Sequence, residues 1–132
     1  MKVSRIKEMD TIHCAALPTA AQYRAWRNLL YQDINTASGR PDDKALAWAR
    51  EVEDETKKIE YFDEVPRRFA MLSRKLAAVL QKIATGELGR KISQTAEDYL
   101  KTGRSVPGLV LLRVVPNGLF DEPSSRGDLQ LK

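Results

Sequence analysis

The chain has 132 residues, of which 42% are hydrophobic and 30% charged, which is typical of a single globular domain rather than a disordered chain. Its one cysteine, Cys14, excludes an intrachain disulfide framework and a zinc site built from several thiolates. The net charge of +4 is uneven, because residues 1–66 hold 10 Lys or Arg against 12 Asp or Glu, and residues 67–132 hold 12 against 6.

The first predicted helix follows a segment without clear periodicity, residues 1–18, which is expected to form a flexible lead-in. Thr19 and Gln22 have the spacing of a capping box, in which each residue binds the other's backbone N–H. The Ser38-Gly39 pair ends this helix, because glycine readily adopts a left-handed conformation. Its apolar face consists of Tyr23, Trp26, Leu30, Ile34 and Ala37.

The second predicted helix is capped by Asp42 or Asp43. Trp26 and Trp48 are expected to anchor the core between the first two helices. The stretch 51–64, with seven carboxylates, is expected to be a linker. The apolar face of the second helix consists of Ala45, Trp48, Ala49 and Val52.

The third predicted helix has the strongest pattern in the chain, with Asp63 as its cap and Pro66 in its first turn. Its apolar positions alternate steps of four and three, which is typical of a packed bundle helix. The Thr85-Gly86 pair ends it. These positions are Val65, Phe69, Leu72, Leu76, Val79 and Ile83.

A fourth helix is predicted from Glu87 to Lys101, and residues 106–115 fit either a fifth helix capped by Ser105 or a buried strand. Helix is favoured because no second strand exists to pair with it. Residues 116–132 are expected to be a disordered tail. The sequence therefore predicts an all-α fold, a small bundle of four to five helices over residues 19–115.

Catalytic chemistry is not expected. His13 and Cys14 are adjacent, so their side chains would not face each other as a base and a nucleophile must. No phosphate-binding glycine motif is present, and no metal site, cofactor or small-molecule substrate is expected. The unpaired thiol, the lack of an export signal and the lack of a long apolar run predict an intracellular protein, in cytoplasm or nucleus, without membrane association.

The third helix has a basic face opposite its apolar face, and no acidic residue lies between Arg67 and Lys82. Such a face can neutralise nucleic-acid phosphates, dock on an acidic partner protein, or simply face solvent. No aromatic residue lies among the cations, so base stacking is not predicted. The predicted nucleic-acid-binding residues are Arg67, Arg68, Arg74, Lys75 and Lys82.

Two stretches of the chain resemble the capsid-type gag proteins of copia-type retrotransposons. The segment 22–30 (QYRAWRNLL) is similar to their opening helix, which has an aromatic residue and a tryptophan at this spacing. The segment 73–88 (SRKLAAVLQKIATGEL) resembles a later capsid helix. The likeness covers residues 19–115 and rests on amphipathic helices with one tryptophan. It implies an all-helical domain that self-associates around RNA.

Two features depart from that family. The Cys–His zinc knuckle of family members is absent, so specific RNA packaging is not implied, and at Pro116 the chain turns into a short tail where the family continues through further helices. A truncated copy is therefore expected. The resulting hypothesis is a module for self-association and non-specific RNA binding. The alternative is a helical protein-interaction adaptor without nucleic-acid or catalytic activity.

Overall fold

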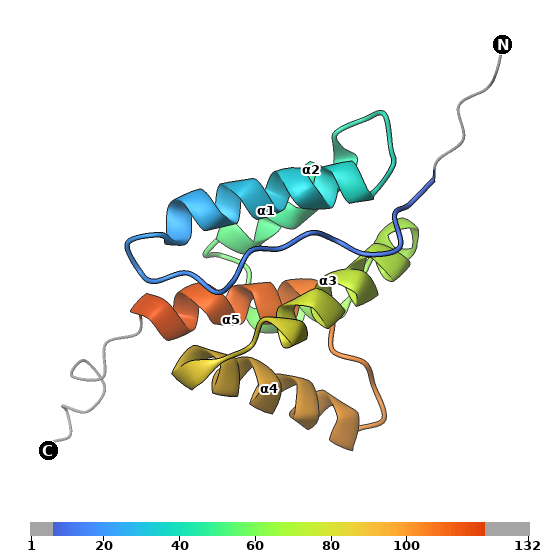
Figure 1. Ribbon diagram of the computed structural model, residues 1–132. Helices are drawn as coiled ribbons and strands as arrows, with labels where there is room; N and C mark the ends of the chain where they lie inside the picture. The colour runs from blue at the N-terminus through green and yellow to red at the C-terminus, as the bar shows by residue number, and fades with distance from the viewer. Residues whose placement is uncertain (1–6, 121–132) are drawn as a thin grey trace, which may run out of the picture.

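Residues 7–120, which the computed structural model describes, form helices and connecting segments and contain no strand (Figure 1). The predicted all-α bundle of four to five helices is confirmed. The α-helices are α1 (Tyr23–Ala37), α2 (Lys44–Arg50), α3 (Ala70–Lys82), α4 (Gly86–Lys101) and α5 (Gly108–Phe120), and the 3-10 turns are η1 (Glu51–Glu53), η2 (Ile59–Asp63) and η3 (Arg67–Phe69).

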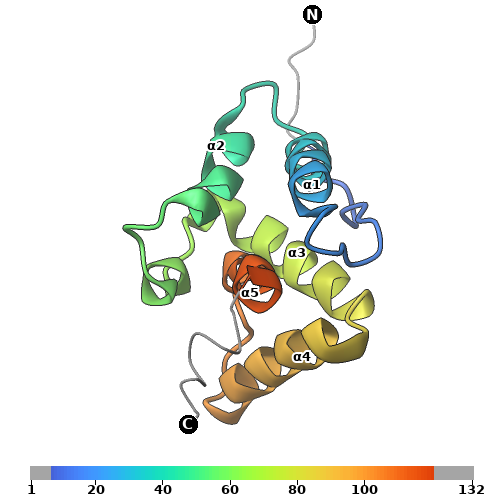
Figure 2. The same ribbon diagram turned by 90° about the vertical axis from the view of Figure 1, so that its left-hand side faces the viewer.

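The central element is α5, which Figure 2 shows end-on between the α1–α2 pair and α4. Helices α3 and α4 pack against it, and the turns η1 and η2 cover another side. A helix that is apolar on every side belongs in a core, which answers the open question on residues 106–115 in favour of helix. Its buried residues are Gly108, Leu109, Val110, Leu111, Leu112, Val114 and Val115.

A close approach between α3 and α5 depends on Gly108. A Cβ atom at this position would lie 2.6 Å from the carbonyl oxygen of Ser73 and 2.8 Å from the Cβ of Leu76. A hydrogen bond joins the two helices at the same point, because the Gly108 N–H donates to Ser73 Oγ over 2.8 Å. This bond satisfies one of the amides that a helix leaves without a partner in its first turn.

The start and end of α1 agree with the sequence signals. The N–H of Thr19 donates to Gln22 Oε1 over 3.0 Å, and the N–H of Gln22 donates to Thr19 Oγ1 over 3.3 Å, so the predicted pair of hydrogen bonds forms, in the turn that leads into α1 at Tyr23. Beyond the helix, Gly39 has a φ of 68°, which a residue with a side chain rarely adopts.

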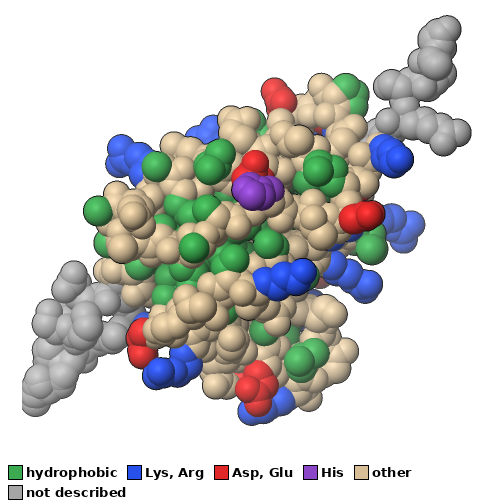
Figure 3. All heavy atoms as spheres, in the orientation of Figure 1, with side chains coloured by type: hydrophobic (Ala, Val, Ile, Leu, Met, Phe, Trp, Pro, Cys, Tyr) green, Lys and Arg blue, Asp and Glu red, His purple; other side chains and the backbone are tan. Residues whose placement is uncertain are grey.

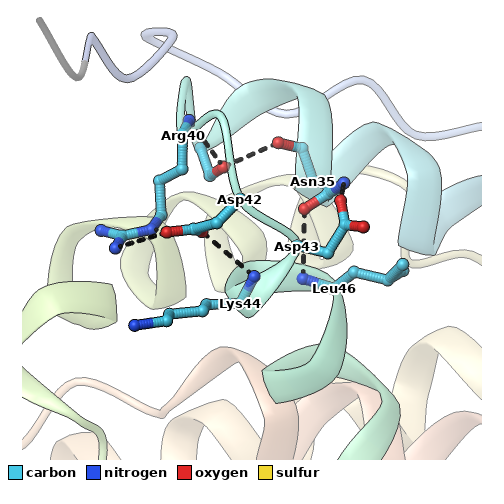
Figure 4. A network of polar contacts seen from close by, with 7 residues as sticks. Asn35, Arg40, Asp42, Asp43, Lys44 and Leu46 are labelled. Atoms are coloured by element: carbon cyan, nitrogen blue, oxygen red, sulfur yellow. Dashed lines mark hydrogen bonds and ion pairs between the residues drawn. The ribbon is translucent and has the colours of Figure 1, made fainter.

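The turn between α1 and α2 is held by side chains that bind backbone amides (Figure 4). The Asn35 amide donates to Asp43 Oδ1 over 3.2 Å, and its Oδ1 accepts the N–H of Leu46 over 3.2 Å. The N-cap residue of α2 is Asp43, and Asp42 Oδ1, one residue earlier, accepts the N–H of Lys44 over 3.1 Å. Helix α2 is thereby fixed against α1.

The two tryptophans are core anchors, as predicted. Trp26 and Trp48 are 7% and 5% exposed. The ring of Trp48 stacks on that of Phe69 with 4.9 Å between centroids, which connects α2 to the turn that precedes α3. The apolar positions predicted for the second helix are all buried, Ala45, Trp48 and Ala49 on α2 and Val52 on η1.

The predicted start of the third helix is wrong. Asp63 does not cap it, because its carboxylate accepts a hydrogen bond from the Tyr99 hydroxyl and α3 begins only at Ala70. The backbone is extended at Glu64 and at Pro66, and η3 follows before α3. A proline restricts the residue before it to extended conformations, so the chain cannot enter a helix at this point.

The predicted start of the tail is also wrong, since α5 continues through Pro116 to Phe120. The contacts of this last turn, in which the partly buried Leu119 packs against the core, offset the hydrogen bond that proline cannot donate. The ring of Phe120 meets that of Tyr23 edge-on, with 5.6 Å between centroids. Residues 1–6 of the predicted lead-in and 121–132 of the predicted tail lie outside the described residues.

The chain ahead of α1 crosses between α1 and α3 (Figure 1). Its Ile12 is 2% exposed and belongs to the core. The N–H of Met9 donates to the carbonyl of Ala37 over 2.8 Å, and the Trp26 indole donates to the carbonyl of Ala15 over 3.2 Å. This part of the predicted lead-in therefore packs on the bundle through single residues rather than through a periodic face.

Candidate nucleic-acid interface

The outer face of α3 is free to bind a partner, because the opposite face of the helix is buried in the core. Leu72, Leu76 and Leu80 are all 0% exposed and pack toward α5. Ser73 and Ala77 are buried as well, whereas Arg74 and Ala78 are exposed and Met71 is 54% exposed. Figure 3 shows Lys and Arg side chains gathered over this part of the molecule.

Three of the predicted cations on this side are exposed and unpaired. Arg67 lies on η3, which leads directly into α3, and Arg74 and Lys82 lie on α3 itself. Among the described residues, none of their side chains makes an ion pair or a hydrogen bond. On the α1–α2 side of the molecule, by contrast, Arg27 and Arg50 both lie 3.6 Å from a carboxylate oxygen of Glu53.

The remaining two predicted cations have partners. Arg68 is exposed, and its guanidinium lies 5.3 Å from the ring centroid of Phe69. Lys75 donates from Nζ to Glu8 Oε1 over 2.6 Å and to the carbonyl of Met9 over 2.9 Å. Lys75 therefore ties α3 to the segment ahead of α1, and its charge is already balanced.

One cation of the same surface was not singled out in the sequence. Arg104 follows α4 and lines, together with Arg74 of α3, a cleft of about 440 Å³. Its guanidinium donates to the carbonyl of Asp63 over 3.3 Å and lies 5.4 Å from the ring centroid of Tyr99. Burial and the Asp63 carboxylate raise the pKa of Tyr99 to about 12, so its hydroxyl stays a donor. No local motif marks Arg104, because Arg74 is 30 positions away.

The pair of His13 and Cys14 has little capacity for nucleophilic chemistry. His13 is exposed, and the half-buried Cys14 donates from Sγ to the carbonyl of its neighbour Ala15 over 3.5 Å. Burial, and to a lesser degree the Asp33 carboxylate, raise the pKa of the Cys14 thiol to about 12. The thiol therefore stays protonated at neutral pH, whereas the thiolate is the nucleophile.

Alkylation of Cys14 by iodoacetamide is expected to be slow in the folded protein. A pKa of about 12 lowers the thiolate fraction at pH 8, and a more basic thiolate offsets this only in part, so the rate should be roughly fiftyfold below that of the unfolded chain. The measurement compares the rates by mass spectrometry in buffer and in denaturant. Equal rates in both would show that the fold does not protect this thiol.

Metal and membrane sites are not indicated within residues 7–120. These residues contain no group of three or more potential metal ligands among His, Cys, Asp and Glu. None of the described helices is both long enough and apolar enough to cross a bilayer.

Comparisons with protein-family models, with curated proteins and with solved structures find no match to this chain. The resemblance of segments 22–30 and 73–88 to gag proteins thus stays a prediction. The function is accordingly inferred from the outer face of α3 and the cleft beside it.

Proposed function

We propose that this chain is a gag-like helical module that binds RNA through its phosphates, without sequence preference, along the outer face of α3. The observation that carries the proposal is the set of exposed cations Arg67, Arg74 and Lys82, which have no partner among the described residues. Unpaired cations release counterions from a nucleic-acid backbone without first breaking an ion pair in the protein.

The lack of base readout follows from the side chains around these cations. The large exposed apolar residue among them is Met71, and the exposed aromatic residues Tyr61 and Phe120 lie on η2 and at the end of α5. Sequence-selective binding of single strands needs aromatic stacking or hydrogen bonds to base edges. Phosphate contacts alone give affinity and position but carry no sequence information.

Self-association is the second part of the proposal and comes from the gag resemblance. The two halves of the chain support it, because residues 1–66 carry a net charge of −2 from 10 cations and 12 anions, and residues 67–132 carry +6 from 12 and 6. The acidic half of one copy attracts the basic half of another when RNA brings the copies together, and salt weakens this attraction.

Neutralising the three unpaired cations tests the RNA-binding part. The variant Arg67→Gln, Arg74→Gln and Lys82→Gln is expected to bind single-stranded RNA with a weaker salt dependence. Each lost phosphate contact removes about 0.7 from the slope of log K against log salt, so three contacts remove about 2. Fluorescence anisotropy of a labelled oligonucleotide at several salt concentrations measures this slope.

The matched control removes three exposed cations from α1, from the segment before η2 and from α4, by Arg24→Gln, Lys58→Gln and Arg90→Gln. It lowers the net charge by the same amount, so general electrostatic attraction weakens equally in both variants. The proposal requires the α3 variant to lose clearly more slope than the control. Equal losses would place the contact elsewhere.

A protein-interaction adaptor remains the alternative because of one observation on α4. Leu100 is 66% exposed and lines a smaller cleft of about 180 Å³ together with Ala77, Ala78 and Ala96. A cleft lined by alanines, with an exposed leucine at its side, can accept an apolar side chain of a partner protein. Under this alternative, a complex with a folded partner forms without RNA and persists at high salt.

A further inference from the structure

The cleft beside α3 brings together hydrogen-bond donors from two separate parts of the chain. Arg74 enters it from α3, and Arg104, Ser105 and Val106 enter it from the connection between α4 and α5. Its volume of about 440 Å³ accommodates a small polar group together with water. It continues into the smaller cleft beside Leu100, since Arg74, Ser105 and Val106 line both.

Most of these donors are free. Within the described residues, the Arg74 side chain and the backbone N–H groups of Ser105 and Val106 donate no hydrogen bond. The Arg104 guanidinium donates one hydrogen bond to the carbonyl of Asp63, over 3.3 Å, and its other N–H groups donate none within the described residues. The lining of the cleft therefore includes two arginines and two residues, Ser105 and Val106, whose backbone N–H groups make no hydrogen bond within the described residues.

The acidic side chain that lines the cleft already has a hydrogen-bond partner. Asp63 lines the cleft, and its carboxylate accepts the hydrogen bond of the Tyr99 hydroxyl. Two arginines against one carboxylate leave a positive charge there. A guanidinium presents its donors in a planar fork that fits the oxygens of phosphate, and donors from several directions suit a tetrahedral anion.

We propose that this cleft binds a single phosphate group of the RNA, with Arg74 and Arg104 on its oxygens and the Ser105 and Val106 amides completing the contact. The inference rests on the proposed function and adds to it a defined phosphate site. The connection between α4 and α5 thereby becomes part of the interface, beside the exposed cations of α3.

The test follows the backbone amides of Ser105 and Val106 by NMR while the folded protein is titrated with inorganic phosphate. We expect both resonances to shift in a saturable manner. Arg104→Gln should weaken the apparent affinity by about fivefold to tenfold, because one charge-assisted contact is lost. The matched control Arg90→Gln, on α4 but outside the cleft, should leave it unchanged.

A second variant separates binding from folding. Arg104 also contacts Asp63 and Tyr99, so its replacement can loosen the connection between α4 and α5. Arg74 makes no side-chain hydrogen bond within the described residues, so Arg74→Gln should cost no stability and still weaken phosphate binding. If neither variant changes the titration, the cleft is not the phosphate site.

Further titrations, followed by the same amide resonances, identify the source of the phosphate. A dinucleotide with a 5′-phosphate that binds better than its 5′-hydroxyl counterpart indicates a strand end, and equal binding indicates an internal diester; both support the proposal. A glutamate-rich peptide that shifts the same amides at least as strongly as phosphate overturns it in favour of an acidic protein partner. The absence of any saturable shift overturns it as well.

The failure of this inference is distinguishable from failure of the proposed function. If long RNA binds with a steep salt dependence and the Ser105 and Val106 resonances do not move, the cleft proposal is wrong and RNA binding along α3 stands. If phosphate occupies the cleft and long RNA does not bind, the proposed function is wrong.

Discussion

Replacing Gly108 with valine is expected to unfold the domain or to destabilise it by at least about 3 kcal/mol. A Cβ at this position would lie 2.6 Å from the Ser73 carbonyl oxygen, which is backbone and cannot rotate away. Valine adds two further carbon atoms and forces α3 away from α5. The gain in helix propensity over glycine is below about 1 kcal/mol, so the clash dominates and the free energy of unfolding falls.

The matched control is Gly118→Val in the same helix. A Cβ at Gly118 would lie 2.6 Å from the end of the Leu88 side chain, which can move, and 3.5 Å from the Lys91 side chain. We expect it to cost about 1 kcal/mol or less. Urea unfolding followed by circular dichroism compares the two variants. A Gly108→Val protein as stable as the control would contradict the close packing of α3 on α5.

Truncating Trp48 to alanine is expected to lower the free energy of unfolding by about 3–5 kcal/mol. Trp48 is 5% exposed and stacks on Phe69, so its removal leaves a cavity between α2 and η3. That loss is a large share of the stability of an ordinary domain. RNA binding should fall with the folded fraction, because η3 carries Arg67.

Two further variants frame this result. Trp48→Phe keeps an aromatic ring against Phe69 and should lose less stability than alanine. Leu100→Ala removes a side chain that is 66% exposed and should change the free energy of unfolding by about 0.5 kcal/mol or less. The measurement is again urea unfolding. Similar losses for Trp48→Ala and Leu100→Ala would show that Trp48 does not anchor the core.

Local signals predicted most helices because their causes lie within a few residues. The capping box of Thr19 and Gln22, the turn at Gly39 and the apolar spacing of α3 each depend on neighbours in the chain. The helix over residues 106–115 required one more step, namely that an apolar segment without a partner strand has to be buried as a helix.

The errors arose where tertiary packing outweighs local rules. Proline usually ends a helix, yet α5 passes through Pro116, and its last turn still packs on the bundle through the contact of Phe120 with Tyr23. Aspartate is a residue type common at helix N-caps, but the backbone between Asp63 and Pro66 is extended. The Asp63 carboxylate instead accepts a hydrogen bond from the Tyr99 hydroxyl. Neither effect is visible in a window of a few residues.

The candidate site was predicted only in part for the same reason. The basic face of α3 is a local pattern, because all of its cations lie between Arg67 and Lys82 and can be recognised from the helical spacing alone. The pairing of Lys75 with Glu8, and the meeting of Arg74 with Arg104, join positions that are distant in the chain. Such contacts need the fold, since charge patterns alone do not tell which cations already have partners.

The central claim is that unpaired cations on the outer face of α3 bind RNA phosphates, and the salt dependence of RNA binding by the unmodified protein tests it most directly. The measurement is fluorescence anisotropy of a labelled single-stranded RNA over a range of salt concentrations. With three to four phosphate contacts, we expect a slope of log K against log salt of about −2 to −3, for RNAs of different sequence alike. Binding that ignores salt, or no binding at low salt, would contradict it.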